Sequence, residues 1–338
     1  MSIGAFFKRF LVSSSVLILQ IKPLFRLVDA GVSWARTYVG KNVKVDQMYR
    51  RMVKVIDFAD SSSGLYGPSY FGFGRTEGDR EGLSGYDSLS IDTSKSDLSA
   101  AIVDYLFAPA SVIEVGCAEG HLVSALVRLG IDARGYDYSR FAVRHSLEEV
   151  SDRIKWGDLL KGLSAESKSA DVVVALETLE HLPPEMIHLA IEELIRLSRG
   201  FIYVTMPSFG PNDMGFDGWF EGKVKDERLE YYKSLGASYE GPVPTVDLAV
   251  DKNGNLVEGH TAIASFSWWR RQFQNAGCVR EIELEKHLYE KIAEFSMTPH
   301  WNAYLFRVPN AKVEVKRDLA DEEAFTRSRR LFDLDRYL

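Results

Sequence analysis

The feature that most constrains this chain is the stretch 111–121, which reads Ser-Val-Ile-Glu-Val-Gly-Cys-Ala-Glu-Gly-His. Its run of β-branched and apolar residues predicts a buried strand that ends at Gly116. Leucines then recur at helical spacing over 122–129, so a helix is expected directly after Gly120. Such a turn directs backbone N–H groups and the positive end of the helix toward one point, and the glycines let a ligand approach the backbone. The stretch therefore predicts a ligand site where a strand passes into a helix.

Four further runs have the composition of strands and alternate with helical patterns. The first, 133–137, ends in Asp137, which lies 23 positions after Glu114. This is close to the offset at which an acid binds ribose hydroxyls in nucleotide-binding folds. The second run precedes Asp158, and the others are 171–176 and 201–207. Strands that alternate with helices predict an α/β fold built on a parallel sheet.

These motifs in this order, without a Gly-x-Gly-x-x-Gly turn, resemble the class I S-adenosylmethionine-dependent methyltransferases. The resemblance covers roughly residues 98–308. It implies an α/β fold with a doubly wound, mostly parallel seven-stranded sheet and S-adenosylmethionine across the carboxyl ends of the strands. It also implies that Glu114 lies near the methionine amino group, that Asp137 holds the ribose diol and that Asp158 accepts from the adenine amino group.

Other cofactor contacts implied by the resemblance come from the glycine loop and from residues beside the acids. They are Gly116, Cys117, Ala118, Gly120, Tyr138, Leu159 and Glu177. The alternative is that the acids only cap helices, which acids at strand–helix junctions often do.

Charge and cysteine content limit the class of protein. The net charge is −7, and a general nucleic-acid binder would show a basic surplus, so bulk nucleic acid is not an expected partner. The two cysteines, Cys117 and Cys278, do not form the pattern of a disulfide framework. We therefore expect a cytoplasmic protein.

The chain is expected to divide into three parts. Residues 1–95 form an N-terminal helical extension and a loop, residues 96–308 form the methyltransferase domain, and residues 309–338 form a charged tail that is a solvated helix or a subunit contact. Residues 1–41 are basic and rich in apolar side chains, but their apolar run is shorter than the roughly 20 residues that span a bilayer. They either pack on the domain or on a second subunit of a homo-oligomer, or make peripheral contact with an anionic membrane.

The stretch 66–86 is rich in glycine and aromatic residues and poor in aliphatic ones. Such a segment is typical of a loop over a ligand, and many proteins that this chain resembles close a similar lead-in over the cofactor. Tyr70, Arg75 and Tyr86 are the candidates there, and Arg75 would pair with the methionine carboxylate. The alternative is an ordinary solvated loop.

A second motif, Glu177-Thr-Leu-Glu180-His181, follows the fourth predicted strand. The two glutamates and the histidine share one helical face if a helix begins by Glu177, and such a set suits Mg²⁺, Mn²⁺, Fe²⁺ or Zn²⁺. The motif resembles the ubiquinone-biosynthesis O-methyltransferases and the enzymes that methylate the 2′-hydroxyl at the 3′ ends of small RNAs. In the latter a further histidine ahead of a Phe-x-Trp helix completes a metal site, which implies His260 as the fourth ligand. The spacing from His260 to Phe266 is longer here, and a neighbouring histidine is missing.

Three roles for this motif remain open. A cation held by Glu177, Glu180, His181 and His260 would lower the pKa of an acceptor hydroxyl and fix its oxygen for attack. Without a metal, His181 or His260 would act as the general base. In the third interpretation the Glu-His pair only lines the cofactor site.

Residues 208–258 are inserted after the fifth strand and are expected to select the substrate. Trp219 would stack on the apolar face of a sugar, while Asp213 or Asp217 would bond its hydroxyls. A helix is predicted over 224–235 and a hairpin around Asn253-Gly254.

The remaining elements complete the expected fold. They are a helix over 266–276 and two antiparallel strands over 279–284 and 302–308.

These expectations together favour an S-adenosylmethionine-dependent O-methyltransferase that acts on a sugar hydroxyl of a surface glycan, glycolipid or nucleotide-sugar. The alternatives are methylation of a phenolic or other natural-product hydroxyl, and a non-catalytic binding protein that keeps the cofactor fold.

Overall fold

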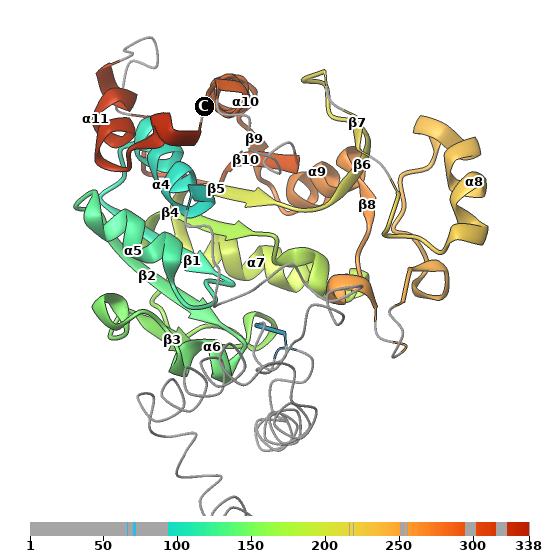
Figure 1. Cartoon of the computed structure of the whole chain (residues 1–338), viewed down its shortest axis with the longest axis horizontal. Coiled ribbons are helices and arrows are strands. Elements are labelled where there is room, and N and C mark those ends of the chain that lie inside the picture. Colours follow the sequence, from blue (N-terminus) through green and yellow to red (C-terminus); the bar gives the residue numbers. More distant parts are fainter. Residues whose placement is uncertain are drawn as a thin grey trace, which may run out of the picture.

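The computed structural model describes residues 66, 70–71, 94–215, 217–218, 220–250, 254, 256–294, 302–315 and 323–337. Seven strands form one sheet in the order β3-β2-β1-β4-β5-β10-β9 (Figure 1). The pairs among β1 to β5 are parallel, and β10 runs antiparallel to both β5 and β9. This confirms the predicted doubly wound, mostly parallel seven-stranded sheet. The strand bounds are β1 Ser111–Val115, β2 Asp132–Asp137, β3 Ile154–Trp156, β4 Ala170–Leu176, β5 Ser198–Thr205, β9 Val279–Arg280 and β10 Ala303–Arg307.

Alternate residues of the strands pack on opposite faces of the sheet, because successive side chains of a strand point to opposite sides. In β4, Val172 and Val174 belong to one apolar core and Val173 and Ala175 to the other. The first core is covered by α4 (Ser94–Phe107), α5 (His121–Arg128), α10 (Ile282–Glu294) and α11 (Glu323–Leu331). The second is covered by α7 (Ile187–Leu197) and α9 (Phe266–Asn275) (Figure 1).

The predicted sixth strand over 279–284 is wrong beyond Arg280. The chain forms only the two-residue β9 there and then enters α10. The alternation Ile-Glu-Leu-Glu over 282–285 looks like a strand, but Leu284, Leu288 and Lys291 are buried at the i, i+4 and i+7 spacing of a helix.

The C-terminal tail is not simply solvated, because one side of α11 belongs to the core. The ring of Phe325 packs edge-on against that of Tyr105 of α4, with 5.6 Å between the ring centroids. Beyond the helix, Phe332 and Leu334 are buried as well. The predicted helix exists, but its apolar residues attach it to the domain.

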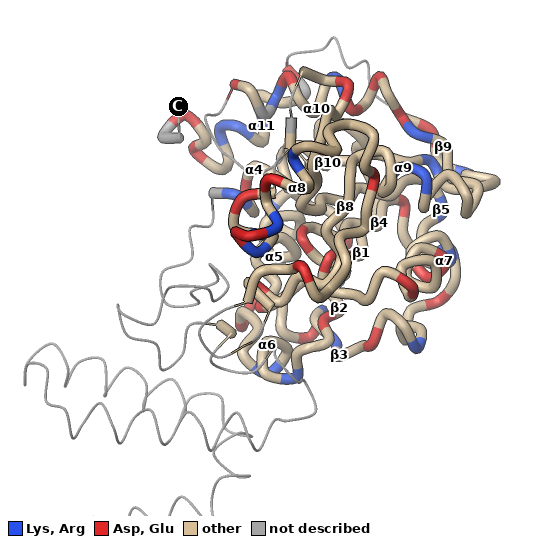
Figure 2. Tube along the Cα trace, turned by 90° about the vertical axis from the view of Figure 1, so that its right-hand side faces the viewer, with Lys and Arg blue, Asp and Glu red and all other residues tan. Residues whose placement is uncertain are grey.

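The insertion after β5 builds a small unit of its own. Its strands β6 (Ser208–Pro211) and β7 (Asp217–Gly218) pair, and β6 also pairs with β8 (Ala264–Ser265). Helix α8 (Asp226–Leu235) matches the predicted helix, and Figure 2 shows acidic and basic residues along it. Val250 and Leu256 form an antiparallel bridge, as the predicted hairpin requires, although most of its turn lies outside the described residues.

Among the described residues, no helix combines the length and the apolar character that crossing a bilayer requires. The predictions for residues 1–65, for Arg75 and for Tyr86 lie outside the described residues, and the predicted domain limits stay predictions.

Candidate functional site

A cavity of about 560 Å³ lies at the carboxyl ends of the central parallel strands. Residues that follow β1, β2, β3 and β4 line it, as expected for a ligand site in this kind of fold. They are joined by the described residues of the aromatic lead-in and by two residues from the end of the insertion. The lining includes Tyr66, Tyr70, Phe71, Gly116, Ala118, Asp137, Tyr138, Asp158, Leu159, Glu177, His181, Glu258 and His260.

The turn after β1 requires glycine for steric reasons. Gly116 has a φ of +77°, and a Cβ atom there would lie 2.2 Å from Oγ1 of Thr178. Thr178 is itself fixed, since its Oγ1 lies 3.2 Å from the carbonyl oxygen of Val115 and 3.0 Å from that of Leu176. Gly120 has a φ of +85° and begins α5. A side chain at Gly116 would therefore collide with Thr178, and one at Gly120 with Ile154, so both positions require glycine for the loop to pack in this form.

Asp137, at the end of β2, is held by two backbone N–H groups. Ala118 donates to Oδ2 and Ser139 donates to Oδ1, each at 2.7 Å. Burial raises the pKa of Asp137 to about 6, and the two backbone bonds oppose that rise. Because each carboxylate oxygen can accept more than one hydrogen bond, Asp137 keeps the capacity to accept from two hydroxyls.

Asp158 caps a short helical turn, as the alternative interpretation of the acids expected, and it also lines the cavity. Its Oδ1 accepts from the N–H of Leu160 at 3.1 Å, and Oδ2 lies 2.8 Å from Nζ of Lys161. It thereby caps the 3₁₀ turn Leu159–Lys161. Leu159 and Tyr138 line the same end of the cavity.

Three of the predicted cofactor contacts do not belong to the cavity lining formed by the described residues. Glu114 and Cys117 are buried instead, and Gly120 begins α5. Burial, and next the charge of Asp137, raise the pKa of Glu114 to about 8. The predicted contact of Glu114 with the methionine amino group stays a prediction.

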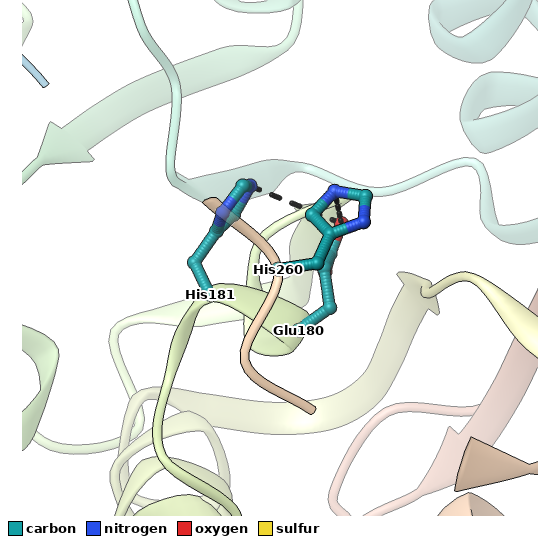
Figure 3. Close-up of side chains that lie close together, drawn as sticks. All are labelled: Glu180, His181 and His260. Atoms are coloured by element: carbon teal, nitrogen blue, oxygen red, sulfur yellow. Dashed lines mark ion pairs between the residues drawn. The ribbon is translucent and has the colours of Figure 1, made fainter. Parts of the chain in front are cut away.

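At the end of the cavity that His181 and His260 line, these two residues meet Glu180 (Figure 3). Glu180 and His181 lie on the 3₁₀ turn Leu179–His181, and His260 follows the insertion. Oε1 of Glu180 lies 4.0 Å from Nε2 of His181 and 3.8 Å from Nε2 of His260. One ligand atom from each residue lies within 4.8 Å of the others. The structure thus brings together three of the four predicted metal ligands.

Glu177 does not share a helical face with the other two residues of its motif. Its φ is +49°, and its N–H donates to the carbonyl oxygen of Thr205 at 2.9 Å, so the chain is still leaving the sheet there. The expected helix over 177–181 is reduced to the single turn that begins at Leu179. Glu177 lines the cavity, and burial raises its pKa to about 7, but it lies outside the set of three.

The electrostatics of the set keep both imidazoles neutral. Burial lowers the pKa of His181, and burial with the nearby Lys223 lowers that of His260 to about 2. Burial, and next the charge of Glu177, raise the pKa of Glu180 well above its ordinary value. Neutral imidazole is the form that binds a metal ion or accepts a proton.

Part of the aromatic lead-in covers this end of the cavity. The ring centroid of Tyr66 lies 5.5 Å from that of His181, and the ring centroid of Tyr70 lies 6.4 Å from it. Ser139 Oγ donates to the carbonyl oxygen of Tyr66 at 2.7 Å, and Phe71 stacks on Phe141. Tyr70 therefore lies where the sequence predicts it, whereas the site prediction missed Tyr66 and Phe71 of the same stretch.

The predicted sugar contacts are not assembled at the cavity. Asp213 lies outside the lining formed by the described residues, because its Oδ2 accepts from Arg270 at 2.7 Å and from Arg280 at 3.1 Å. The side chains of Asp217 and Trp219 lie outside the described residues. Instead, Glu258 of the insertion lines the cavity, a residue that no sequence motif indicated.

The sheet order, the glycine loop and the acid at the end of β2 agree with the class I, S-adenosylmethionine-dependent methyltransferase fold that the sequence motifs resemble. In agreement, residues 91–238 match the model of a family described as a methyltransferase domain. The cofactor of this domain is S-adenosylmethionine, and the site fits it: Gly116 and Ala118 of the turn line the same cavity as Asp137, a carboxylate suited to a ribose diol.

Two curated relatives match part of the chain. The ubiquinone biosynthesis O-methyltransferase of Cupriavidus pinatubonensis (strain JMP 134 / LMG 1197) is 38% identical over 101 residues, which are 28% of this chain and 40% of the relative. The protein of the same name from Albidiferax ferrireducens (strain ATCC BAA-621 / DSM 15236 / T118) is 35% identical over 78 residues, which are 21% and 31%. The chain thus spans less than half the length of either relative.

Among solved structures, an O-methyltransferase family protein from Burkholderia thailandensis aligns with a TM-score of 0.40 at 13% identity, covering 65% of this chain and 57% of that one.

Proposed function

We propose that this protein is an S-adenosylmethionine-dependent O-methyltransferase in which Glu180, His181 and His260 hold a divalent cation that binds the acceptor hydroxyl. One observation carries the cation. The side chain of Glu180 is completely buried, and among the described residues neither of its carboxylate oxygens accepts a hydrogen bond. A buried carboxylate without donors is strongly disfavoured, and a bound cation removes that penalty.

The ligand set and its dimensions agree with this assignment. Two neutral imidazoles and a carboxylate suit Fe²⁺, Zn²⁺ or Mn²⁺, and three protein ligands leave coordination positions for the acceptor. Ligand atoms at about 2.1 Å from one ion lie at most about 4.2 Å apart. The distances of 4.0 Å and 3.8 Å from Oε1 of Glu180 to the two Nε2 atoms fall within this limit, and a bound cation would draw the three ligand atoms, which lie within 4.8 Å of one another, closer together.

The residues of the chain have separate roles in the reaction. S-adenosylmethionine supplies an electrophilic methyl group when bound, and Asp137 would hold its ribose while the Gly116 turn allows it to approach the backbone. Glu180, His181 and His260 would hold the cation, whose charge lowers the pKa of an acceptor hydroxyl. The rings of Tyr66 and Tyr70 cover the same end of the cavity and exclude water from it.

The competing metal-free mechanism uses the same residues differently. His181 is neutral and lies in the cavity wall, so it is the candidate general base for the acceptor hydroxyl, whereas the low pKa of His260 makes that imidazole a poor proton acceptor. This mechanism does not account for the unsatisfied carboxylate of Glu180.

For the acceptor we infer a phenolic hydroxyl ahead of a sugar hydroxyl. The two curated relatives are named as O-methyltransferases of ubiquinone biosynthesis, which supports the phenolic alternative. The sugar hypothesis keeps one support, namely that a cation with open positions is able to bind a vicinal diol. It loses the predicted contribution of Asp213, whose carboxylate is paired with two arginines.

The test measures methyl transfer from S-adenosylmethionine to a catechol and to a panel of sugars and nucleotide-sugars. We expect transfer to the catechol to stop after chelation, to return with added Mn²⁺ or Zn²⁺, and to fall at least about 100-fold in Glu180→Ala. The control is Glu185→Ala, an exposed acid on the next turn, which should keep wild-type rates. Unchanged turnover both after chelation and in Glu180→Ala would contradict the cation, and methylation of sugars alone would contradict the phenolic acceptor.

A further inference from the structure

Glu258 lines the cavity beside His260, but the proposed reaction gives its carboxylate no role. We propose that Glu258 is a positioning residue: its carboxylate accepts the Nδ1–H of His260 and thereby keeps the Nε2 atom of His260 directed at Glu180 as a metal ligand. This inference rests on the proposed cation site.

The tautomer of the other histidine shows what the cluster requires. Nδ1 of His181 lies 3.2 Å from the carbonyl oxygen of Gly259. A carbonyl oxygen only accepts, so Nδ1 of His181 carries the hydrogen and Nε2 carries the lone pair. That Nε2 atom is the one that faces Glu180. His181 is therefore preset as a ligand by a backbone group of the 258–260 loop.

His260 needs an equivalent partner, and Glu258 is placed to be one. Nε2 of His260 faces Glu180, while its Nδ1 lies 3.6 Å from Oε2 of Glu258. Among the described residues, this buried Nδ1 atom has no hydrogen-bond partner. The separation is longer than a hydrogen bond, and a small movement of the His260 ring toward the half-buried Glu258 carboxylate would close it.

The backbone holds Glu258 in a conformation that glycine would adopt more easily. Its φ and ψ are 55° and 8°, in the left-handed region, where a residue with a side chain is strained. Lys223, from an earlier part of the insertion, pairs with the same carboxylate. Strain that is retained at a cavity wall, with a lysine fixing the side chain, indicates that the carboxylate is used there.

The same loop also fixes the third ligand. The N–H groups of Thr261 and Ala262 donate to the carbonyl oxygen of Glu180 at 2.7 Å and 2.9 Å. One loop at the end of the insertion thus sets the positions of all three ligands. In metal sites, a histidine ligand commonly donates its second N–H to a carboxylate, and removal of that partner weakens metal binding about 10- to 100-fold.

The experiment measures the affinity of the full chain for Mn²⁺ and Zn²⁺ by calorimetric titration, and its thermal midpoint in parallel. In Glu258→Gly the strain is relieved, so the midpoint should stay or rise, while the metal affinity should fall about 10- to 100-fold. Glu258→Gln keeps an acceptor oxygen and should recover most of that affinity. A purely structural role for Glu258 does not predict opposite changes in stability and affinity.

The matched control is Glu221→Ala, which removes another glutamate of the insertion that pairs with a lysine, Lys233, at 3.2 Å. It should leave the metal affinity unchanged. If the wild type binds metal and Glu258→Gly binds it equally tightly, the role of Glu258 is refuted while the cation site stands. If the wild type binds neither metal, the proposed cation site fails and this inference fails with it.

Discussion

Substitution of Gly116 by alanine separates two costs that the turn after β1 avoids. The φ of Gly116 is +77°, where an L-residue is disfavoured by roughly 1–2 kcal/mol. The new Cβ would also lie 2.2 Å from Oγ1 and 2.7 Å from Cγ2 of Thr178. Because hydrogen bonds hold Thr178 in place, relieving this overlap should cost about 1–3 kcal/mol more. The free energy of unfolding should therefore fall by about 2–5 kcal/mol in Gly116→Ala.

Gly222 provides the matched control for the conformational cost alone. Its φ is +72°, and among the described residues no atom lies within 4 Å of a Cβ built there. Chemical denaturation followed by circular dichroism should give a loss of about 1–2 kcal/mol for Gly222→Ala. Calorimetry should show weaker S-adenosylmethionine binding in Gly116→Ala and wild-type binding in Gly222→Ala.

A second substitution tests the assignment of the collision to Thr178. In Gly116→Ala/Thr178→Ala the two closest atoms are gone, and the nearest remaining one is Cβ of residue 178 at 3.0 Å. Most of the extra loss should then be recovered, beyond the sum of the single effects. Equal losses at positions 116 and 222, or no recovery in the double variant, would refute the steric reasoning.

Two further predictions concern groups behind and above the cavity. The pKa of Glu114 is about 8 in the folded state and 4.5 in its ordinary state. Between these pH values the folded protein keeps a proton that the unfolded chain releases. The free energy of unfolding should therefore fall as the pH rises from 4.5 to 8. Denaturation at pH 5 and pH 8 should show that Glu114→Gln gains stability relative to the wild type at the higher pH; a constant difference would speak against it. Phe71→Ala removes the ring that stacks on Phe141 at a centroid distance of 5.7 Å, so stopped-flow should show faster S-adenosylmethionine dissociation, and an unchanged rate would exclude a covering role for the lead-in.

Much of the fold follows from local patterns in the sequence. The strand and helix around Gly116 are predictable because apolar spacing and glycine placement are local properties of the sequence. The order of the strands in the sheet follows from the family that these motifs resemble. The sixth strand fails because Ile282-Glu-Leu-Glu satisfies a period of two over four residues. Only the burial of Leu284 and Leu288 against the same core distinguishes the helix.

The part of the site around Asp137 was predictable from the sequence, and the part around Glu180 was less so. Asp137 is set by its position at the end of a strand, whereas the approach of His260 to Glu180 depends on how an insertion of some fifty residues returns to the sheet. The left-handed backbone of Glu177 and Glu258 is not encoded by any residue preference, since glutamate does not favour it. The partners of Asp213 were equally inaccessible, because Arg270 and Arg280 lie far from it in sequence.

The central claim is that S-adenosylmethionine occupies the cavity between the Gly116 turn and Asp137. Calorimetric titration of the full chain with S-adenosylmethionine tests it directly, with Asp137→Ala titrated alongside. We expect one bound cofactor per chain in the wild type and at least about tenfold weaker binding in the variant, because two hydrogen bonds to a charged group are lost. Absence of binding to the wild type, or equal affinity in the two proteins, would contradict it.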